Sequence, residues 1–113
     1  MTVYDYFERA YRRSLDPVAG EPVCDEHGNC AMFSVDVMAG RIAAVRYRCT
    51  VCITLVGLCQ HLSELVTGLD AGAILEMQPD TLLGLHPEVP ESKRPAALLA
   101  LEALQSAVGG ARQ

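Results

Sequence analysis

The feature that most constrains the fold is a change of pattern across two cysteines, within residues 41–66. Up to Arg48, apolar residues alternate with polar ones, which is typical of a strand with one buried face. After Cys52, apolar residues recur every three or four positions, which is typical of a helix. Cys49 and Cys52 therefore lie where a strand ends and a helix begins, and at such a position the helix dipole favours thiolate over thiol.

The residues before this junction predict a β-hairpin. One strand is expected over residues 31–38 and the other over residues 41–48, with a tight turn at Ala39-Gly40. The expected apolar face of the hairpin consists of Ala31, Phe33, Val35, Val37, Ala43, Val45 and Tyr47.

Helices are expected on both sides of the hairpin. Thr2 and Asp5 have the spacing of a capping box, which predicts a helix to about Ser14. Its expected apolar face is Tyr4, Phe7 and Tyr11. The main helix follows Cys52 and is expected to end near Gly68. Its apolar positions are Leu55, Leu58, Cys59, Leu62, Leu65 and Val66.

Further helices are predicted in the C-terminal third. Asp70 caps a short one to about Met77, residues 79–85 form another, and Ser92 caps the last one. The apolar stripe of the last helix is Ala97, Leu98, Leu101, Leu104 and Val108, and Gly109-Gly110 ends it. This order predicts a single α+β domain over residues 1–113, with an N-terminal helix and a small antiparallel sheet of two or three strands packed on several C-terminal helices.

Composition excludes several classes of protein. The 113 residues are half hydrophobic and carry a net charge of −5, without a basic cluster, so no nucleic-acid partner is expected. The longest apolar stretch, Ile53–Val66, is interrupted by polar residues, so no membrane span is expected. The N-terminal residues lack the pattern of a signal peptide, so we expect a cytoplasmic protein with reduced cysteines.

Four of the five cysteines fall in two clusters roughly 25 residues apart. Cys24 and Cys30 enclose a polar loop that also contains Asp25 and His27, and the second cluster is the Cys49/Cys52 pair. Soft thiolates held by short loops are typical metal ligands, so this arrangement predicts a metal or metal–sulfur site.

One cysteine and two histidines stand outside these clusters. Cys59 lies on the apolar helix face and is expected to be a packing residue. His61 is expected to face solvent or to form a hydrogen bond, and His86 stands in no informative pattern. No nucleophile–base order is evident, because Cys52 and His61 on one helix would be about 13 Å apart along its axis. No enzymatic activity is therefore expected.

Several segments resemble one known family. Val23-Cys24-Asp25-Glu26 stands where the family has Cys-Gly-Asp, and the spacing from Gly40 to Cys52 matches without a gap. Ser63-Glu64-Leu-Val-Thr-Gly68 resembles Thr-Glu-Trp-Val-Lys-Gly, and Pro95–Ala103 resembles a last helix that begins His-Cys-Ser-Leu-Leu-Ala. The family is that of the U-type iron–sulfur cluster scaffolds, which includes the N-terminal domain of NifU and the IscU proteins.

The resemblance implies that Cys24, Asp25 and Cys52 hold a cluster or zinc. The third family cysteine falls on Ala96, and the segment that the family's Hsp70 chaperone recognises is absent. Cys30 and Cys49 stand near the retained ligands, which leads to the hypothesis of a four-thiolate set of Cys24, Cys30, Cys49 and Cys52. Such a set suits Zn²⁺ or a [2Fe–2S] cluster.

The expected function is that of an iron–sulfur cluster scaffold or carrier. By resemblance, its partners are a cysteine desulfurase and cluster-acceptor proteins, Cys52 accepts persulfide sulfur, and Asp25 is the labile ligand. The alternative is a zinc-binding structural or interaction module, which the loss of the third cysteine favours. A weaker possibility is a thiol-redox regulator that uses Cys49 and Cys52.

Overall fold

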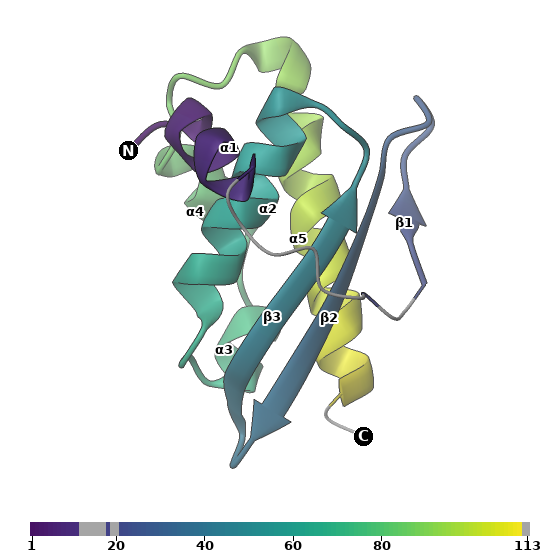
Figure 1. The fold of residues 1–113 in the computed structure, drawn as a ribbon, viewed down its shortest axis with the longest axis vertical. Coiled ribbons are helices and arrows are strands. Elements are labelled where there is room, and N and C mark those ends of the chain that lie inside the picture. Colours follow the sequence, from purple (N-terminus) through teal and green to yellow (C-terminus); the bar gives the residue numbers. More distant parts are fainter. Residues whose placement is uncertain (12–17, 19–20, 112–113) are drawn as a thin grey trace.

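The structure, a computed structural model, describes residues 1–11, 18 and 21–111. Its elements are α1 (Val3–Tyr11), β1 (Val23–Cys24), β2 (Cys30–Met38), β3 (Arg41–Cys49), α2 (Ile53–Val66), α3 (Ala71–Leu75), α4 (Pro79–Gly84), the 3-10 turn η1 (Glu91–Lys93) and α5 (Pro95–Ala111). The strands form one antiparallel sheet in the order β1-β2-β3. Figure 1 shows α5 and α2 lying along this sheet, with α1 packed against α2. The predicted α+β architecture is confirmed.

The hairpin forms where the alternation predicts it. Ala39 and Gly40 both have positive φ, at 54° and 79°, as the two central residues of a type I′ turn require. The strands pair from Met38 opposite Arg41 to Ala31 opposite Cys49. The turn therefore sets a register that brings Cys49 to the end of the sheet where the cysteine loop begins.

One face assignment in the hairpin is wrong. Ala43 is exposed, and the neighbouring Ile42 is 1% exposed and belongs to the core. The pairing shifts between Asp36 and Val37, so Val37 lies opposite Ile42 and Ala43 is left out of the register. An extra residue in one strand reverses which side chains point to the core.

The first helix begins at the predicted capping box but buries another face. The backbone N–H of Thr2 donates to Asp5 Oδ2 at 2.8 Å. The predicted helix end at Ser14 lies outside the described residues. The residues that pack inward are Val3, Tyr6 and Ala10, whereas two of the predicted three, Tyr4 and Tyr11, are 54% and 73% exposed. The prediction was wrong because it treated tyrosine as a core residue. The tyrosine ring carries a hydroxyl group and can also lie exposed on a helix surface.

The main helix α2 supplies much of the core. Leu55, Leu58, Cys59, Leu62 and Val66 are all buried, as the spacing predicts. Gly68, with φ 89°, follows the helix end at the position predicted for a stop signal. Among the described residues no helix combines the length and the apolar character that crossing a membrane demands.

The last helix differs from the prediction at both ends. Ser92 lies in the turn η1 and is not the cap, because α5 begins at Pro95, whose fixed φ suits a first helical turn. Gly109-Gly110 does not end the helix, which continues to Ala111. Leu98 is 47% exposed, whereas the other predicted apolar positions are buried.

The helices α1 and α2 approach each other closely at Gly57. A Cβ atom at this position would meet the Val3 carbonyl oxygen and would lie 2.5 Å from Val3 Cγ2. We predict that Gly57→Ala destabilises the protein by about 1–3 kcal/mol through overpacking, despite the better helix propensity of alanine. Urea unfolding followed by circular dichroism measures the change.

A matched control is Gly109→Ala in α5, where a Cβ would meet nothing within 4 Å. This substitution should leave the stability unchanged or raise it by up to about 1 kcal/mol. Equal effects of the two substitutions would contradict the close packing of α1 on α2.

Candidate functional site

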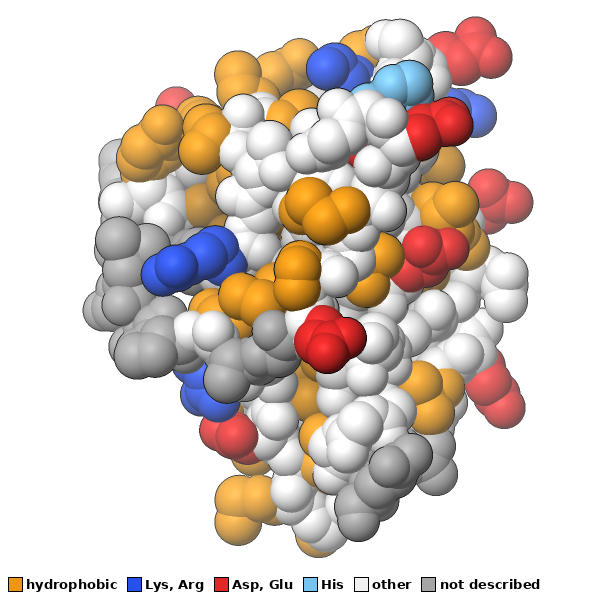
Figure 2. Space-filling view, turned by 90° about the vertical axis from the view of Figure 1, so that its right-hand side faces the viewer, with side chains coloured by type: hydrophobic (Ala, Val, Ile, Leu, Met, Phe, Trp, Pro, Cys, Tyr) orange, Lys and Arg blue, Asp and Glu red, His pale blue; other side chains and the backbone are white. Residues whose placement is uncertain are grey.

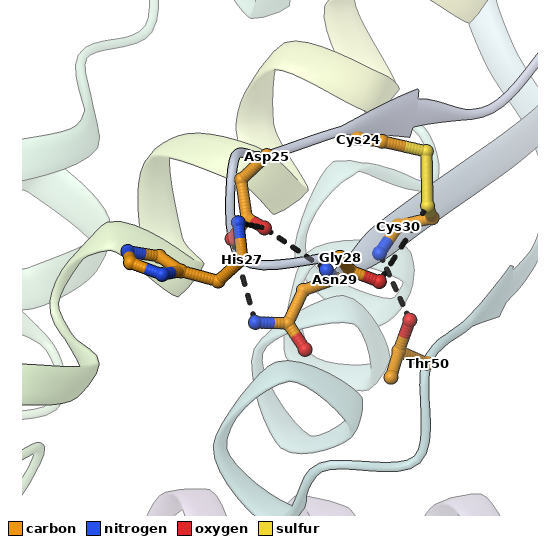
Figure 3. The surroundings of a disulfide bond; sticks show 7 residues. All are labelled: Cys24, Asp25, His27, Gly28, Asn29, Cys30 and Thr50. Carbon is orange, nitrogen blue, oxygen red and sulfur yellow. Dashed lines mark hydrogen bonds between the residues drawn. A yellow bond between two sulfur atoms is a disulfide. The ribbon is translucent and has the colours of Figure 1, made fainter.

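The loop between β1 and β2 is a compact turn organised by Asp25. The Asp25 N–H donates to the Asn29 carbonyl at 2.8 Å, and Asp25 Oδ1 accepts the backbone N–H groups of His27 and Asn29, both at 2.9 Å. Figure 3 shows the carboxylate turned into the loop, with the His27 ring on the side away from Cys24 and Cys30. A side chain that caps its own turn in this way holds the loop in one conformation.

The same hydrogen bonds favour the ionised carboxylate of Asp25. Desolvation opposes ionisation, but the donors on Asn29 and His27 outweigh it and hold the pKa of Asp25 below its ordinary value of 3.8. Asp25 Oδ2 has one longer contact, at 3.4 Å from Asn29 Nδ2. The loop thus presents a negatively charged oxygen.

Cys24 and Cys30 form a disulfide, which corrects the expectation that all cysteines stay reduced. The two residues face each other across β1 and β2, and their Cα atoms are 4.0 Å apart. Directly opposed positions on antiparallel strands bring side chains close together. The sequence shows the spacing of the two cysteines but not this pairing, which depends on the turn at Asp25.

Cys52 occupies the predicted position at the start of α2. It is the N-cap residue, with φ −143°, and its carbonyl accepts the Val56 N–H at 2.8 Å. Its side chain is half-buried and makes no capping hydrogen bond, and its neighbours Val51 and Ile53 are 82% and 47% exposed. The thiol therefore lies at the N-terminus of α2, the positive end of the helix dipole.

Thr50 joins the two cysteine segments. Its Oγ1 accepts the N–H of Cys30 at 2.9 Å, and its own N–H donates to the Cys30 carbonyl at 2.9 Å. This pair of hydrogen bonds fixes the end of the cysteine loop against the junction between β3 and α2. Segments that are 20 residues apart in sequence thus become neighbours.

A pocket of about 260 Å³ opens between these segments and the start of α5. Its lining residues are Asp25, His27, Asn29, Cys52, Leu55, Ser92, Lys93, Pro95, Ala96 and Leu99. Two of the predicted ligands, Asp25 and Cys52, therefore share one cavity with Ala96, the position at which the resemblance puts the missing cysteine. Lys93 also lines the pocket, although it was not predicted as a site residue. Its position just before the predicted last helix is the only sequence signal that could have identified it.

The four-thiolate set is not assembled in this disulfide form. Cys24 and Cys30 lack thiolate groups while they are bonded to each other, and neither they nor Cys49 line the pocket. Within residues 1–11, 18 and 21–111, no group of three or more His, Cys, Asp or Glu side chains could hold a metal ion. Metal ligation by Cys24, Cys30, Cys49 and Cys52 stays a prediction.

The fifth cysteine, Cys59, lies in the core and is 0% exposed, as expected for a packing residue.

A second polar cluster lies under α1, and in it His61 forms a hydrogen bond, which is one of the two alternatives that the sequence left open. His61 Nδ1 and His86 Nε2 are 2.5 Å apart, and His86 Nδ1 lies 2.9 Å from Glu88 Oε2. The same Glu88 oxygen accepts the Val3 N–H at 2.8 Å, and the Tyr6 ring stacks on His61 with centroids 4.1 Å apart. An ionised Glu88 carboxylate can only accept, so in the neutral form of His86 the Nδ1 donates to Glu88 and the Nε2 accepts from His61. These side chains do not line the pocket, and they fasten α1 to the rest of the fold.

The surface beside the pocket has mixed character. Figure 2, which looks onto the β1 side, shows charged side chains of both signs scattered among apolar ones. Among the described residues on this face, basic side chains do not gather into one area.

Comparisons with known proteins support the fold. Neither a protein-family model nor a curated protein matches the sequence. An N-terminal NifU-like protein domain from Brucella abortus is similar in structure, with a TM-score of 0.71 and 13% identity, covering 97% of this chain and 91% of that one.

Two hypothetical proteins are also similar in structure. One crystal structure has a TM-score of 0.71 at 17% identity, covering 95% of this chain and 93% of that one. A solution structure of a protein from Thermus thermophilus has a TM-score of 0.64 at 23% identity, covering 97% of this chain and 81% of that one. At these identities the comparisons establish the shared fold.

The pair of half-buried His61 and buried His86 predicts a stability that depends on pH. Burial, and next the neighbouring His86, lower the pKa of His61 below its ordinary value of 6.5, while Glu64 acts in the opposite direction. As the pH falls below about 6.5, the unfolded chain binds the proton first, so the free energy of unfolding decreases. Urea unfolding at about pH 7.5 and about pH 5.5 measures this decrease, which His61→Gln should reduce.

The charged and titratable groups that act on His61 are His86, Glu64 and the N-terminal amine. Tyr6 stacks on its ring, Arg9 pairs with Glu64, and Glu88 contacts His86. The pKa of Glu88 is also lowered, because the hydrogen bonds from Val3 and His86 outweigh desolvation. Protonation of Glu88 lowers the stability only as the pH falls below its ordinary pKa of 4.5, which is outside the pH range compared in this experiment. The control is His27→Gln at an exposed position, which should keep the wild-type pH dependence. An identical loss of stability in all three proteins would refute the assignment to His61.

Proposed function

We propose that this chain is a scaffold or carrier that binds an iron–sulfur cluster, or its iron and sulfide precursors, as cargo. One observation supports the proposal above all others: Asp25, Cys52 and Ala96 line a single pocket. These are three positions at which the scaffold family, by resemblance, has ligands. The structural similarity to a NifU-like N-terminal domain supports the same function at the level of architecture.

The side chains around the pocket suit such cargo. The Cys52 sulfur supplies a soft ligand at a helix N-terminus, and Asp25 Oδ2, with one long hydrogen bond, has electron pairs left for a metal. Lys93 adds a positive charge that favours an anionic thiolate–metal assembly. Cys24, next to Asp25, becomes a further thiolate ligand once its disulfide is reduced.

In this proposal the chain holds and passes on its cargo without turning over a substrate. The Cys52 thiolate attacks the outer sulfur of a persulfide on a cysteine desulfurase. The S–S bond of that persulfide breaks, and the desulfurase cysteine leaves as a thiolate. An external electron donor then supplies the two electrons that cleave the Cys52 persulfide into a thiolate and sulfide, iron joins this sulfide on the ligands, and the cluster passes to an acceptor protein. Asp25 is the weaker ligand and therefore the one from which the cluster departs first.

The alternative of a zinc-binding structural or interaction module has less support. A closed zinc site needs four ligands at once, and the disulfide withholds two of its four proposed sulfurs. The experiment below distinguishes the two functions, because a zinc module would take up zinc without acid-labile sulfide.

We predict that Cys52→Ser abolishes the uptake of iron and sulfide by protein reduced with a dithiol. The serine hydroxyl cannot replace the thiolate as a soft ligand. Anaerobic reconstitution followed by absorption spectra, iron analysis and sulfide analysis measures the loading. The wild-type protein should show charge-transfer bands with iron and sulfide in stoichiometric amounts.

The matched control is Cys59→Ala, which removes a buried sulfur from the core. It should lower the stability by about 1–2 kcal/mol and leave the loading intact. A larger loss of loading in Cys59→Ala than in Cys52→Ser would overturn the assignment of the site, and zinc without sulfide in the wild type would favour the module.

We predict that Ala96→Cys strengthens cluster retention, because Ala96 lines the pocket with Asp25 and Cys52. The rate at which a chelator removes iron from the loaded protein measures retention. Leu98→Cys is the control, since Leu98 lies on the same helix, is 47% exposed and does not line the pocket. Equal rates for the two variants would contradict the placement of Ala96.

A further inference from the structure

The cysteine loop contains a surface disulfide one residue away from the pocket. Cys24 is exposed and Cys30 is half-buried, so small thiols and disulfides in solution can reach the bond. Asp25, which follows Cys24 directly, lines the pocket. Cys24 itself does not line the pocket while it is bonded to Cys30, so reduction of the bond would free a thiol on the residue next to Asp25.

The loop is held in place by bonds other than the disulfide. Asp25 fixes the turn through the N–H groups of His27 and Asn29, and Thr50 fixes the backbone of Cys30 on both sides. Figure 3 shows the hydrogen bonds of the Asp25 carboxylate and the one from the Cys30 N–H to Thr50 Oγ1, none of which involves a sulfur atom, beside a longer contact of 3.9 Å between Cys30 Sγ and the Gly28 carbonyl. Reduction can therefore release two thiols while the loop keeps its position next to the pocket.

The disulfide joins a different pair of cysteines from the pair that has the spacing of a redox motif. Cys49 and Cys52 have the spacing of a redox motif, but both lie outside the disulfide. The bond instead joins Cys24 to Cys30, so Cys52 keeps its thiol in the oxidised protein. Oxidation thus removes one ligand of the proposed site and leaves the other.

We propose that the Cys24–Cys30 disulfide is a redox switch that controls loading of the site. This inference rests on the proposed function. In the oxidised form Cys24 cannot ligate a metal, because its sulfur is bonded to Cys30 and has no thiolate charge. In the reduced form Cys24 joins Asp25 and Cys52, and the site accepts its cargo.

The switching step is thiol–disulfide exchange with a low-molecular-weight disulfide. The Cys24–Cys30 bond forms as the S–S bond of the small disulfide breaks, and two molecules of the small thiol leave with the two protons. The two electrons pass from the protein thiols to the small disulfide. A dithiol reverses the step by forming its own cyclic disulfide.

The test compares the wild type, Cys30→Ser and Cys24→Ser after treatment with oxidised glutathione or with dithiothreitol, each followed by anaerobic desalting. Both substitutions remove the disulfide, but only Cys24→Ser removes the ligand. Thiol alkylation with mass spectrometry reports the disulfide independently of metal. Zn²⁺ affinity and reconstitution with iron and sulfide then report loading.

We expect oxidation to weaken Zn²⁺ binding to the wild type by at least about tenfold, the smallest loss usual when even a residue that orients a metal ligand is removed. Cys30→Ser should bind strongly after both treatments, and Cys24→Ser weakly after both. Mass spectrometry should detect the bond between Cys24 and Cys30 only in the oxidised wild type.

Different failures of this test have different meanings. Equal loading of the oxidised and reduced wild type, with the disulfide confirmed by alkylation, would overturn the switch and leave the scaffold function standing. Failure of glutathione disulfide to form the Cys24–Cys30 bond in folded protein would also overturn the switch. If reduced wild type and Cys30→Ser both take up neither zinc nor iron and sulfide, the proposed function itself fails.

Discussion

The arrangement of the candidate site depends on two hydrogen bonds between Thr50 and the backbone of Cys30. Each is 2.9 Å long, and together they close the end of the sheet where the cysteine loop meets the start of α2. They continue the pairing of β2 and β3, which ends with Ala31 opposite Cys49, into the residues that lead to Cys52. With them, Asp25 and Cys52 line one pocket, and the first turn of α5 completes it at Ala96. The three segments are distant in sequence, but the sheet and two helices hold each of them in place. The site therefore needs few ordered residues beyond those that the fold already orders.

The parts of the fold that local patterns determine could be predicted from the sequence. Alternation, together with a turn at Ala39-Gly40, was enough to predict the hairpin, since strand period and turn conformation are local properties. The spacing of apolar residues likewise identified α2 and its buried face. The position of Cys52 at the helix start followed from the change of period at that point. Two of the pocket residues could therefore be named, and the resemblance identified the position of Ala96.

The parts that depend on long-range packing could not be predicted. Which face of α1 is buried depends on its contact with Gly57, and the bulge beside Ile42 depends on how the two strands pair. The disulfide requires Cys24 and Cys30 to face each other, which only the folded turn reveals. His61 and His86 are 25 residues apart in sequence, and no local pattern connects them. In each case the missing information is a contact between segments, whereas the sequence reports mainly on neighbours along the chain.

The central claim is that the cysteine loop, the start of α2 and the start of α5 form one site for a thiophilic metal. The most direct test is to add Zn²⁺ to the dithiol-reduced, isotope-labelled protein and follow its backbone amide resonances by nuclear magnetic resonance. We predict that the resonances that shift belong to residues 24–30, 50–53 and 92–96, with those of His61 and His86 unchanged. Shifts confined to the two histidines, or to only one of the three segments, would contradict the claim.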